Sequence, residues 1–518
     1  MTNRDLKEAW AYHNGTKHSY HSTLTSRHYL DWDNQPRPFK SYVDLDPIYL
    51  PEPGSSSGVA ALSAIAALGP QSESPLSTGR GDQMNKKTLA EILFLTAGIT
   101  RRRPFPGGEI LFRAAACTGA LYHIDLYVVC GGLADLEAGV YHFAPDDFAL
   151  RMLRAGDYRS FVNYAAADEA AVADAQAVVV FAATYWRNTW KYQSRTYRHC
   201  FWDSGTMLAN LLAVSAAREW PCRVLAGFVD RAVNGLLGLE EEREAALVLV
   251  PLGRWAGQEP VPAAQPDPLR YATLPLSMSE VDYPMIRAMH AASSLETAEE
   301  VAGWRGRPLK AAEPGAPQGR SFPLHPLVAG EWPADSIEDV IRRRGSTRTF
   351  AREAIGFHAL STILIQSTRG IPADFLDGGR LNQLYLIVNA VDGIPAGAYA
   401  FHPERRVLEL LKEGEFRAEA GHLGLGQEIP ADASVNVYFL TDLREILERF
   451  GNRGYRAAQL EAATAAGKMY LAAYAQGLGA SGLTFFDDEV TDFFSPSAAG
   501  KSVMFLLALG KALRHARK

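Results

Sequence analysis

The stretch YHFAPDDFAL at residues 141–150 returns as YAFHPERRVL at residues 399–408. Tyr, Phe, Pro and Leu occupy the first, third, fifth and last positions of both stretches, which lie 258 residues apart (399 − 141 = 258). This shift is close to half of the 518 residues in the chain. The repeat therefore predicts two copies of one fold, which would form a pseudo-dimer within a single chain.

Other matches keep the same shift. Leu126-Tyr127 recurs as Leu384-Tyr385, and the pattern Arg195-x-Tyr197-Arg198 recurs as Arg453-x-Tyr455-Arg456. Because two related copies pack most simply about a pseudo-two-fold axis, we expect the function to reside where they meet. Differences between the copies should then indicate which of two equivalent sites still works.

Composition and charge are typical of a soluble globular protein. Apolar residues make up 47% of the chain and charged residues 21%, and the length suits two to three domains. The net charge of −6 argues against nucleic-acid binding. The four cysteines have neither CxxC nor zinc-site spacing, which favours reduced thiols and a cytoplasmic location. The N-terminus lacks signal-peptide features, and the longest apolar run, residues 58–69, is too short to span a membrane.

The chain divides into four predicted segments. Residues 1–85 form an N-terminal arm, and residues 86–255 hold copy one. Residues 256–332 form a Pro-rich linker with a helical stretch at 279–304, and residues 333–518 hold copy two. The pattern predicts strands at 126–130, 175–184, 246–252 and 434–441, and helices at 203–217 and 459–476. Strands mixed with helices predict an α+β fold.

A basic segment, RRRGSTR at residues 342–348, follows a predicted helix start at which Ser336 and Asp339 resemble a capping box. Arg342 and Arg343 would complement the helix dipole. That interpretation leaves the residues beyond the helix unexplained, whereas two guanidinium groups that flank a hydroxyl suit a phosphate. On the pattern alone, both interpretations stay open.

Two segments of copy one also carry chemistry. Residues 113–122 (RAAACTGALY) combine small side chains with Gly119, which would let the backbone approach a flat ligand. A tight turn before a strand explains the same pattern. Lys191-Tyr192 supplies two proton-active groups whose pKa values respond to burial. A solvated basic face with one packed aromatic ring is the simpler alternative there.

In their order and spacing, these segments resemble the FMN-dependent nitroreductase fold family, in its branch of azoline-oxidising (SagB/ThcOx-type) dehydrogenases. The resemblance covers most of the chain. Copy one is similar to the branch in these runs: Arg113 with TGALY at 118–122, GVYHF at 139–143, Lys191-Tyr192 with Arg195-x-Tyr197-Arg198, Asp203-x-Gly205, and GFVD at 227–230. Copy two carries Arg344-x-Ser346-x-Arg348 and the tail from GASG at 479–482 to Leu509-Gly-Lys511.

The resemblance implies FMN as cofactor, shared across the interface of the two copies. In the family, one protomer holds the phosphate with the Arg-Ser-Arg loop and C-terminal basic residues, and the other lays its small-residue loop over the flavin. The implied cofactor-binding residues are Arg344, Ser346, Arg348, Ser481, Gly482, Lys511 and Arg514 of copy two, with Ala116, Cys117, Thr118 and Gly119 of copy one. Lys191 and Tyr192 are the implied catalytic pair, and no metal is implied.

The copies have lost complementary parts of these motifs. At the shift of 258, Lys191-Tyr192 becomes Arg449-Phe450, and the loop CTGALY becomes FLDGGR at 375–380. Copy one in turn lacks an Arg-x-Ser-x-Arg motif, since residues 77–83 offer only Arg80. We therefore expect one working composite site and an empty reciprocal site.

The leading functional hypothesis is an oxidoreductase that transfers a hydride between its substrate and N5 of FMN, while Lys191 or Tyr192 removes the partner proton. The resemblance implies azoline-to-azole oxidation of a peptide. An NAD(P)H-dependent nitro- or quinone reductase is the nearest alternative, and a non-catalytic scaffold that binds a peptide or an enzyme is an alternative of another class. The expected partner is a small-molecule or peptide substrate, with no nucleic acid and no membrane, for a monomeric pseudo-dimer or a homodimer.

Overall fold

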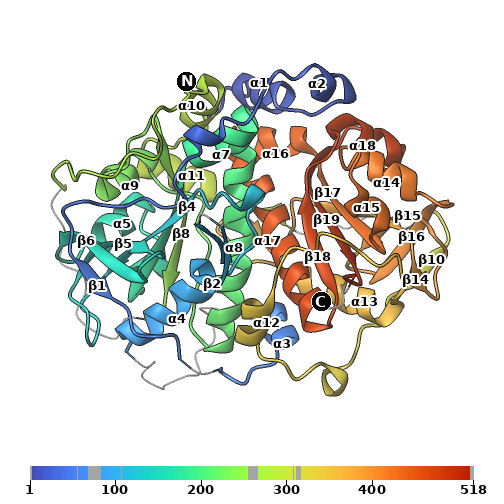
Figure 1. The fold of residues 1–518 in the computed structure, drawn as a ribbon, viewed down its shortest axis with the longest axis horizontal. Helices are drawn as coiled ribbons and strands as arrows, with labels where there is room; N and C mark the ends of the chain where they lie inside the picture. The colour runs from blue at the N-terminus through green and yellow to red at the C-terminus, as the bar shows by residue number, and fades with distance from the viewer. Residues whose placement is uncertain are drawn as a thin grey trace.

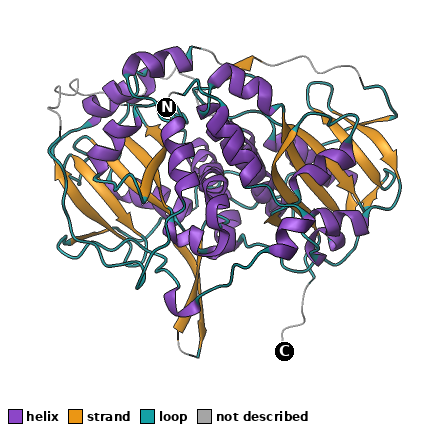
Figure 2. Ribbon diagram, turned by 90° about the horizontal axis from the view of Figure 1, so that it is seen from above, coloured by secondary structure: helices purple, strands orange, loops and turns teal. Residues whose placement is uncertain are grey.

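Two antiparallel sheets, one in each copy, form the outer layers of the molecule, and helices fill the space between them (Figure 1 and Figure 2). The computed structural model describes residues 3–54, 56–67, 83–106, 108–254, 266–306, 309–310 and 317–513. The sheet of copy one begins with β1 (Pro47–Tyr49) of the arm and continues with β6 (Ala149–Ala155), β5 (Gly139–Ala144), β4 (Ile124–Cys130), β7 (Ala177–Thr184) and β8 (Glu244–Leu252). In copy two the strand order is β10 (Ser321–Pro323), β16 (Val407–Glu413), β15 (Gly397–His402), β13 (Gln383–Val388), β17 (Val435–Thr441), β19 (Ser502–Gly510) and β18 (Gly479–Leu483).

The two sheets have the same register at the shift found in the sequence. Val128 pairs with Tyr141 in copy one, and Leu386 pairs with Tyr399 in copy two (128 + 258 = 386; 141 + 258 = 399). A register break precedes Tyr141 in one sheet and Tyr399 in the other. The predicted α+β fold with two tandem copies is therefore confirmed.

Two long helices, α8 (Thr196–Ala217) and α17 (Arg453–Ala475), lie side by side at the centre of the molecule (Figure 1). Both begin earlier than the periodicity predicted. The other helices around copy one are α1 (Lys7–Gly15), α2 (Tyr20–Thr25), α3 (Ala61–Ala66), α4 (Lys86–Ala97), α5 (Arg159–Ala165), α6 (Ala170–Ala173), α7 (Trp186–Tyr192) and α9 (Asp230–Leu237). The linker and copy two hold α10 (Pro284–Ala292), α11 (Ala298–Arg305), α12 (Ile337–Arg343), α13 (Phe357–Ser367), α14 (Arg417–Leu423), α15 (Glu428–Asp432), α16 (Leu443–Phe450) and α18 (Asp487–Phe494).

The remaining strands lie outside the two large sheets. Strands β2 (Ile99–Phe105) and β3 (Gly108–Arg113) form a hairpin that projects from copy one in Figure 2. Two parallel pairs belong to copy two and the linker: β11 (Ile355–Gly356) with β14 (Val391–Asp392), and β9 (Leu309–Lys310) with β12 (Leu376–Asp377). The predicted single helical stretch at 279–304 was wrong, because α10 ends at Ala292 and α11 begins only at Ala298. Within the described ranges, no helix is long and apolar enough to cross a membrane.

Glycines allow α8 and α17 to meet at close range. A Cβ on Gly205 would lie 2.5 Å from that of Ala463, and a Cβ on Gly467 would lie 2.7 Å from that of Ala209. Both pairs are counterparts at the shift of 258 (205 + 258 = 463; 209 + 258 = 467). Counterparts touch each other only along a symmetry axis, so the pseudo-two-fold axis passes between these helices.

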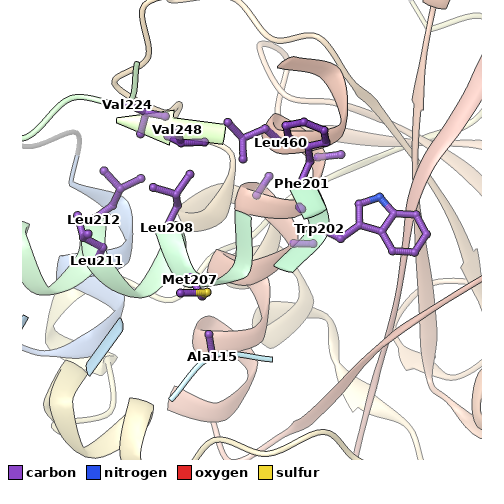
Figure 3. Packing of buried hydrophobic residues seen from close by; sticks show 14 of the residues in the cluster. Ala115, Phe201, Trp202, Met207, Leu208, Leu211, Leu212, Val224, Val248 and Leu460 are labelled. Carbon is purple, nitrogen blue, oxygen red and sulfur yellow. The ribbon is translucent and has the colours of Figure 1, made fainter. Parts of the chain in front are cut away.

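The core of copy one packs on the outer side of α8. In Figure 3, Leu208 and Leu212 point toward Val224 and Val248, whereas Trp202 points the opposite way, toward the strands of copy two. Trp202 Nε1 donates a hydrogen bond to Gln459 Oε1 of α17 at 2.6 Å. One helix thus buries an apolar face in its own copy and sends side chains into the other.

Each copy clasps the other with a buried pair of arginines. Arg195 and Arg198 of copy one donate to the carboxylate of Asp487 in copy two at 2.9 and 2.6 Å. Arg453 and Arg456 of copy two donate to Asp230 of copy one at 2.5 and 2.6 Å. We call these contacts the two arginine clasps. The Arg-x-Tyr-Arg motif, noticed as a repeat in the sequence, therefore holds the copies together.

The arm and the linker repeat each other as well, at a different shift. Arg198 Nε donates to Thr16 Oγ1 in the arm, and Arg456 Nε donates to Ser293 Oγ in the linker (16 + 277 = 293). Likewise Asp487 N donates to the carbonyl of His18, and Asp230 N donates to that of Leu295 (18 + 277 = 295). Helices α1 and α2 of the arm therefore correspond to α10 and α11 of the linker.

Candidate active site

One cavity of about 320 Å³ lies between the copies, beside α8. Copy one contributes Ala116, Cys117, Thr118, Gly119, Lys191 and Tyr192, and copy two contributes Ser346, Arg348, Ser481 and Gly482. These are ten of the residues singled out in the sequence. We call this space the composite cavity, because neither copy encloses it alone.

The loop from copy one reaches the cavity through an unusual backbone. Gly119 has φ of 61°, and Ala120 and Tyr122 also have positive φ. A Cβ on Gly119 would lie 2.8 Å from the hydroxyl oxygen of Tyr192. Glycine is therefore required here both for the left-handed conformation and for the close approach of the catalytic candidate.

Asp203 of α8 fixes this loop. Its carboxylate accepts hydrogen bonds from Thr118 N at 2.9 Å, from Thr118 Oγ1 at 3.0 Å and from Cys117 Sγ at 2.9 Å. Asn188 Nδ2 donates to Thr118 Oγ1 at 2.8 Å from the opposite side. Burial first, and then the charge of Asp203, raises the pKa of the Cys117 thiol, so this cysteine stays protonated. The protonated thiol is therefore the donor in the bond to Asp203.

Lys191 and Tyr192 stand at the end of α7, where Gln193 turns the chain with φ of 50°. Burial, and then the charge of Asp203, raises the pKa of Tyr192, so its hydroxyl is a donor at neutral pH. Partial burial, followed by repulsion from Arg348, lowers the pKa of Lys191. The pair therefore offers one protonated hydroxyl and one amine that loses its proton more easily than an ordinary lysine.

Arg344 lies outside the cavity lining. Its Nε and one terminal nitrogen donate to the carbonyls of Ala114 and Arg113 at 2.9 and 3.0 Å, and a second terminal nitrogen donates to its own neighbour, Gly345, at 3.2 Å. The guanidinium thus joins the basic loop of copy two to the strand end that leads into the small-residue loop of copy one. Ser336 caps the helix beside it, since Asp339 N donates to Ser336 Oγ at 3.2 Å. The Asp339 side chain accepts from the Ser336 hydroxyl at 2.8 Å, so one half of the predicted capping box is formed.

Lys511 also lies outside the lining, and Arg514 lies outside the described residues. Lys511 Nζ is 3.1 Å from a carboxylate oxygen of Glu353 near the surface. The tail is nevertheless close to the basic loop, because Ala351 N donates to the Lys511 carbonyl and Leu513 N donates to the Thr349 carbonyl. The structure therefore places the C-terminal tail beside the residues that follow Arg348.

Several residues of the cavity wall were not selected from the sequence. They are His199, Trp202, Asp203, Thr206, Gln427, Tyr470, Leu483, Thr484 and Phe505. Only Asp203 gave a signal, in the run Asp203-x-Gly205. The contact of Asn188 with His199 joins α7 to α8 and could not be read from the sequence. His199 Nδ1 lies 2.9 Å from Asn188 Oδ1, and burial lowers the pKa of His199 well below its usual value, so the imidazole is neutral.

The cavity offers what a flat, anionic cofactor needs. Among the described residues, His199 Nε2 and Thr484 Oγ1 are buried polar atoms without a hydrogen-bond partner, and both side chains line it. Aromatic rings of Tyr192, Trp202 and Phe505 stand in the same wall, and Arg348 supplies a positive charge. These features fit FMN, whose ring is apolar on its faces and polar on its edges.

A possible metal-donor set overlaps with the loop anchor. Cys117, His123 and Asp203 bring one donor atom each to within 4.8 Å of one another. Asp203, however, already accepts three hydrogen bonds from the loop, and Cys117 Sγ accepts a further one from Tyr122 N at 3.1 Å. In this structure Cys117 and Asp203 fix the loop by hydrogen bonding, and His123 Nδ1 lies 3.2 Å from a carboxylate oxygen of Asp203.

Comparison with known proteins points to one family. A model of the nitroreductase family matches residues 82–254 and 377–511, which together make up more than half of the chain. A solved protein of Anabaena variabilis, described as a nitroreductase, is 26% identical, with a TM-score of 0.76 over 98% of this chain and 99% of its own.

Two curated relatives match a single segment each. The protein MJ1384 of Methanocaldococcus jannaschii, also described as a nitroreductase, is 25% identical over 168 residues, which are 32% of this chain and 80% of its own length. The microcin B17-processing protein McbC of Escherichia coli is 26% identical over 153 residues, or 29% of this chain. That match spans only 53% of McbC.

Proposed function

The chain belongs to the nitroreductase family, and we propose that it is an FMN-dependent oxidoreductase with one flavin site, built from both copies. The observation that carries this proposal is the composite cavity, where the small-residue loop and Lys191-Tyr192 of copy one face Ser346 and Arg348 of copy two. The motifs lost by each copy are those that the other retains at this cavity.

The two copies would divide the binding of FMN. Arg348 and Ser346, with Ser481 and Gly482 of β18, would hold the phosphate and the polar edge of the cofactor. The Ala116–Gly119 loop would cover the ring, held in place by Asp203. Arg344 would act through this loop rather than on the phosphate, since its guanidinium is bonded to the Arg113 and Ala114 carbonyls. Lys511 and Arg514 remain candidates for the outer end of the phosphate.

FMN, when bound, supplies a hydride acceptor at N5 of its ring. The proton that leaves the substrate with the hydride needs a base, and we assign this role to Lys191. Its pKa is lowered by burial and by Arg348, so the neutral amine is more accessible near neutral pH. Tyr192, whose pKa is raised, would remain a hydrogen-bond donor that orients the substrate.

For the substrate we propose a peptide, whose azoline ring would be oxidised to an azole. Support comes from the resemblance of copy one to azoline-oxidising dehydrogenases and from the match to a microcin B17-processing protein. The competing proposal is reduction of nitro compounds or quinones by NAD(P)H, which the match to MJ1384 favours. The free thiols of all four cysteines suit the proposed cytoplasmic setting.

The decisive experiment is the absorption spectrum of the purified protein with its released flavin quantified, beside Arg348→Ala. We expect FMN near one per chain in the wild type and strong loss in the variant. Arg352→Ala is the matched control, because Arg352 is an exposed arginine near Arg348 that pairs with Asp432 outside the cavity. No flavin after reconstitution with excess FMN would favour the non-catalytic scaffold, and retention of FMN by Arg348→Ala would refute the assigned role of Arg348.

A second measurement separates the two oxidoreductase proposals. NAD(P)H is added to the holoprotein without oxygen, and the flavin absorbance is followed. Rapid bleaching would support the reductase. A flavin that stays oxidised with NAD(P)H, but is bleached by an azoline-containing peptide, would support the dehydrogenase.

A further inference from the structure

The pseudo-symmetry defines a second position, which we call the reciprocal position, where the counterparts of the composite cavity meet. Cys117 and Tyr192 of the cavity correspond to Phe375 and Phe450 (117 + 258 = 375; 192 + 258 = 450). Beyond α8 the shift is 257, as the two clasp carboxylates show, Asp230 and Asp487 (230 + 257 = 487). The counterpart of the cavity residue Thr484 is therefore Gly227 (227 + 257 = 484).

All three counterparts contact one side chain, Trp304 of α11. Its ring centroid lies 5.6 Å from that of Phe450 and 6.3 Å from that of Phe375. A Cβ on Gly227 would lie 2.9 Å from the indole. Trp304 is 1% exposed, and its Nε1 donates to the Phe450 carbonyl at 2.9 Å. A flat aromatic group with its polar atom satisfied thus fills this position.

The polar edge of the reciprocal position is occupied as well. Asp374, the counterpart of Ala116 (116 + 258 = 374), accepts hydrogen bonds from the backbone nitrogens of Ala226 and Gly227 at 2.9 and 2.8 Å. Where the composite cavity has a methyl group, the reciprocal position has a fully buried carboxylate that takes up two backbone donors. Arg305, the residue after Trp304, lies 3.6 Å from Asp374 and 3.2 Å from Glu169.

The matching element of the arm does not enter the composite cavity. Helix α2, the counterpart of α11, has no buried residue. In α11, by contrast, Val301 and Trp304 are fully buried. The same repeated helix is therefore a surface element beside one position and an inserted element at the other.

We propose that Trp304, with Asp374, is a built-in occupant of the reciprocal position and limits the chain to one flavin. The indole takes up part of the space that the larger flavin ring would need, and the carboxylate takes two backbone donors at its edge. This inference rests on the proposed function for the identity of the excluded ligand. The contacts of Trp304 stand without it.

The test is binding of lumiflavin, a flavin ring without ribityl or phosphate, which needs no phosphate clamp. Stoichiometry is measured by equilibrium dialysis for the wild type and for Trp304→Gly/Asp374→Ala. We expect the number of bound rings to rise by one per chain in the double variant, because a vacated apolar cavity binds flat aromatic molecules. Trp332→Gly is the control, since it deletes a half-buried indole outside the lining of the composite cavity, where its Nε1 donates to the Leu327 carbonyl.

The outcomes separate this inference from the proposed function. A rise of one ring per chain in the double variant supports the occupied reciprocal position. The FMN content of the wild type decides the composite flavin site separately, because lumiflavin lacks the phosphate that Ser346 and Arg348 would hold. An unchanged number in a folded double variant, judged by circular dichroism, overturns the inference. Should that variant fail to fold, titration of the wild type with excess FMN decides: a plateau at one or below supports the inference, and two per chain overturns it.

Discussion

Arg195 and Arg198 bind Asp487 across the interface, and Arg453 and Arg456 bind Asp230 in return. At these clasps the two copies have kept the same residues and the same geometry. At the two ligand positions they have diverged completely: one is a cavity of about 320 Å³, and the other is filled by Trp304. The two copies therefore agree in the contacts that join them and differ at the position where we propose that FMN binds. The following predictions test each side of this contrast, from the largest expected effect to the smallest.

Counterpart substitutions at the catalytic pair should have very unequal effects. Lys191→Ala should lower kcat by about 10²–10⁴-fold, the usual contribution of a general base. Arg449→Ala, at the same position of copy two, should leave kcat unchanged. Arg449 belongs to α16, beside the reciprocal position that Trp304 fills. Turnover is measured at equal FMN content. Equal losses in both variants would mean that both positions react.

Counterpart substitutions at the clasps should, by contrast, have equal effects. Asp230→Asn and Asp487→Asn each leave two buried arginines without a counter-charge, which costs about 3–5 kcal/mol of unfolding free energy. Asp488→Asn is the control, because Asp488 is exposed and its pairing with Lys17 contributes at most about 1 kcal/mol. Urea unfolding measures all three. A difference of more than about 2 kcal/mol between the two clasp variants would refute their equivalence.

Lowering the pH should weaken the ion pairs of the arginine clasps and so destabilise the fold. Burial alone raises the pKa of Asp230, but Arg453 and Arg456 outweigh it and lower the pKa from 3.8 to about 2. A carboxylate with a lowered folded-state pKa stabilises the fold above its unfolded pKa and loses that contribution as pH falls. We expect the wild type to lose about 2 kcal/mol through this group between pH 4 and pH 2. Asp230→Asn should lack this part of the loss in urea unfolding at each pH, and identical pH profiles would contradict the assignment.

The smallest contrast concerns one glycine. Gly119→Ala places a side chain in a left-handed conformation against the Tyr192 hydroxyl, at an expected cost of about 1–3 kcal/mol and with weaker FMN binding. Asp377→Ala, at the counterpart position (119 + 258 = 377), changes an exposed side chain and should stay within about 0.5 kcal/mol. Thermal unfolding and released flavin are compared for both. Loss of flavin in Asp377→Ala would mean that the reciprocal loop contributes to the site.

The sequence allowed correct predictions where a feature depends on a short local pattern. The shift of 258 predicted the sheet registers, because strand patterns survive in both copies. The loop at 116–119 and Lys191-Tyr192 were selected through the family resemblance, and they meet in one cavity. The contacts of Arg344 with two carbonyls could not be predicted, because a guanidinium serves a phosphate or a backbone equally well. The position of Trp304 could not be predicted from the sequence. Its helix, α11, belongs to a repeat with a different shift, 277, and the burial of the indole is visible only in the packed structure.

The pseudo-two-fold axis between Gly205 and Ala463 also has a consequence for how the site assembles. When two separate chains form a site, the fraction of assembled sites depends on protein concentration, and dilution dissociates the two chains. Here the partners are tethered, so the effective concentration of each for the other does not depend on how much protein is present. The composite cavity should therefore keep its affinity for FMN at protein concentrations where a weakly associated pair of chains would have come apart.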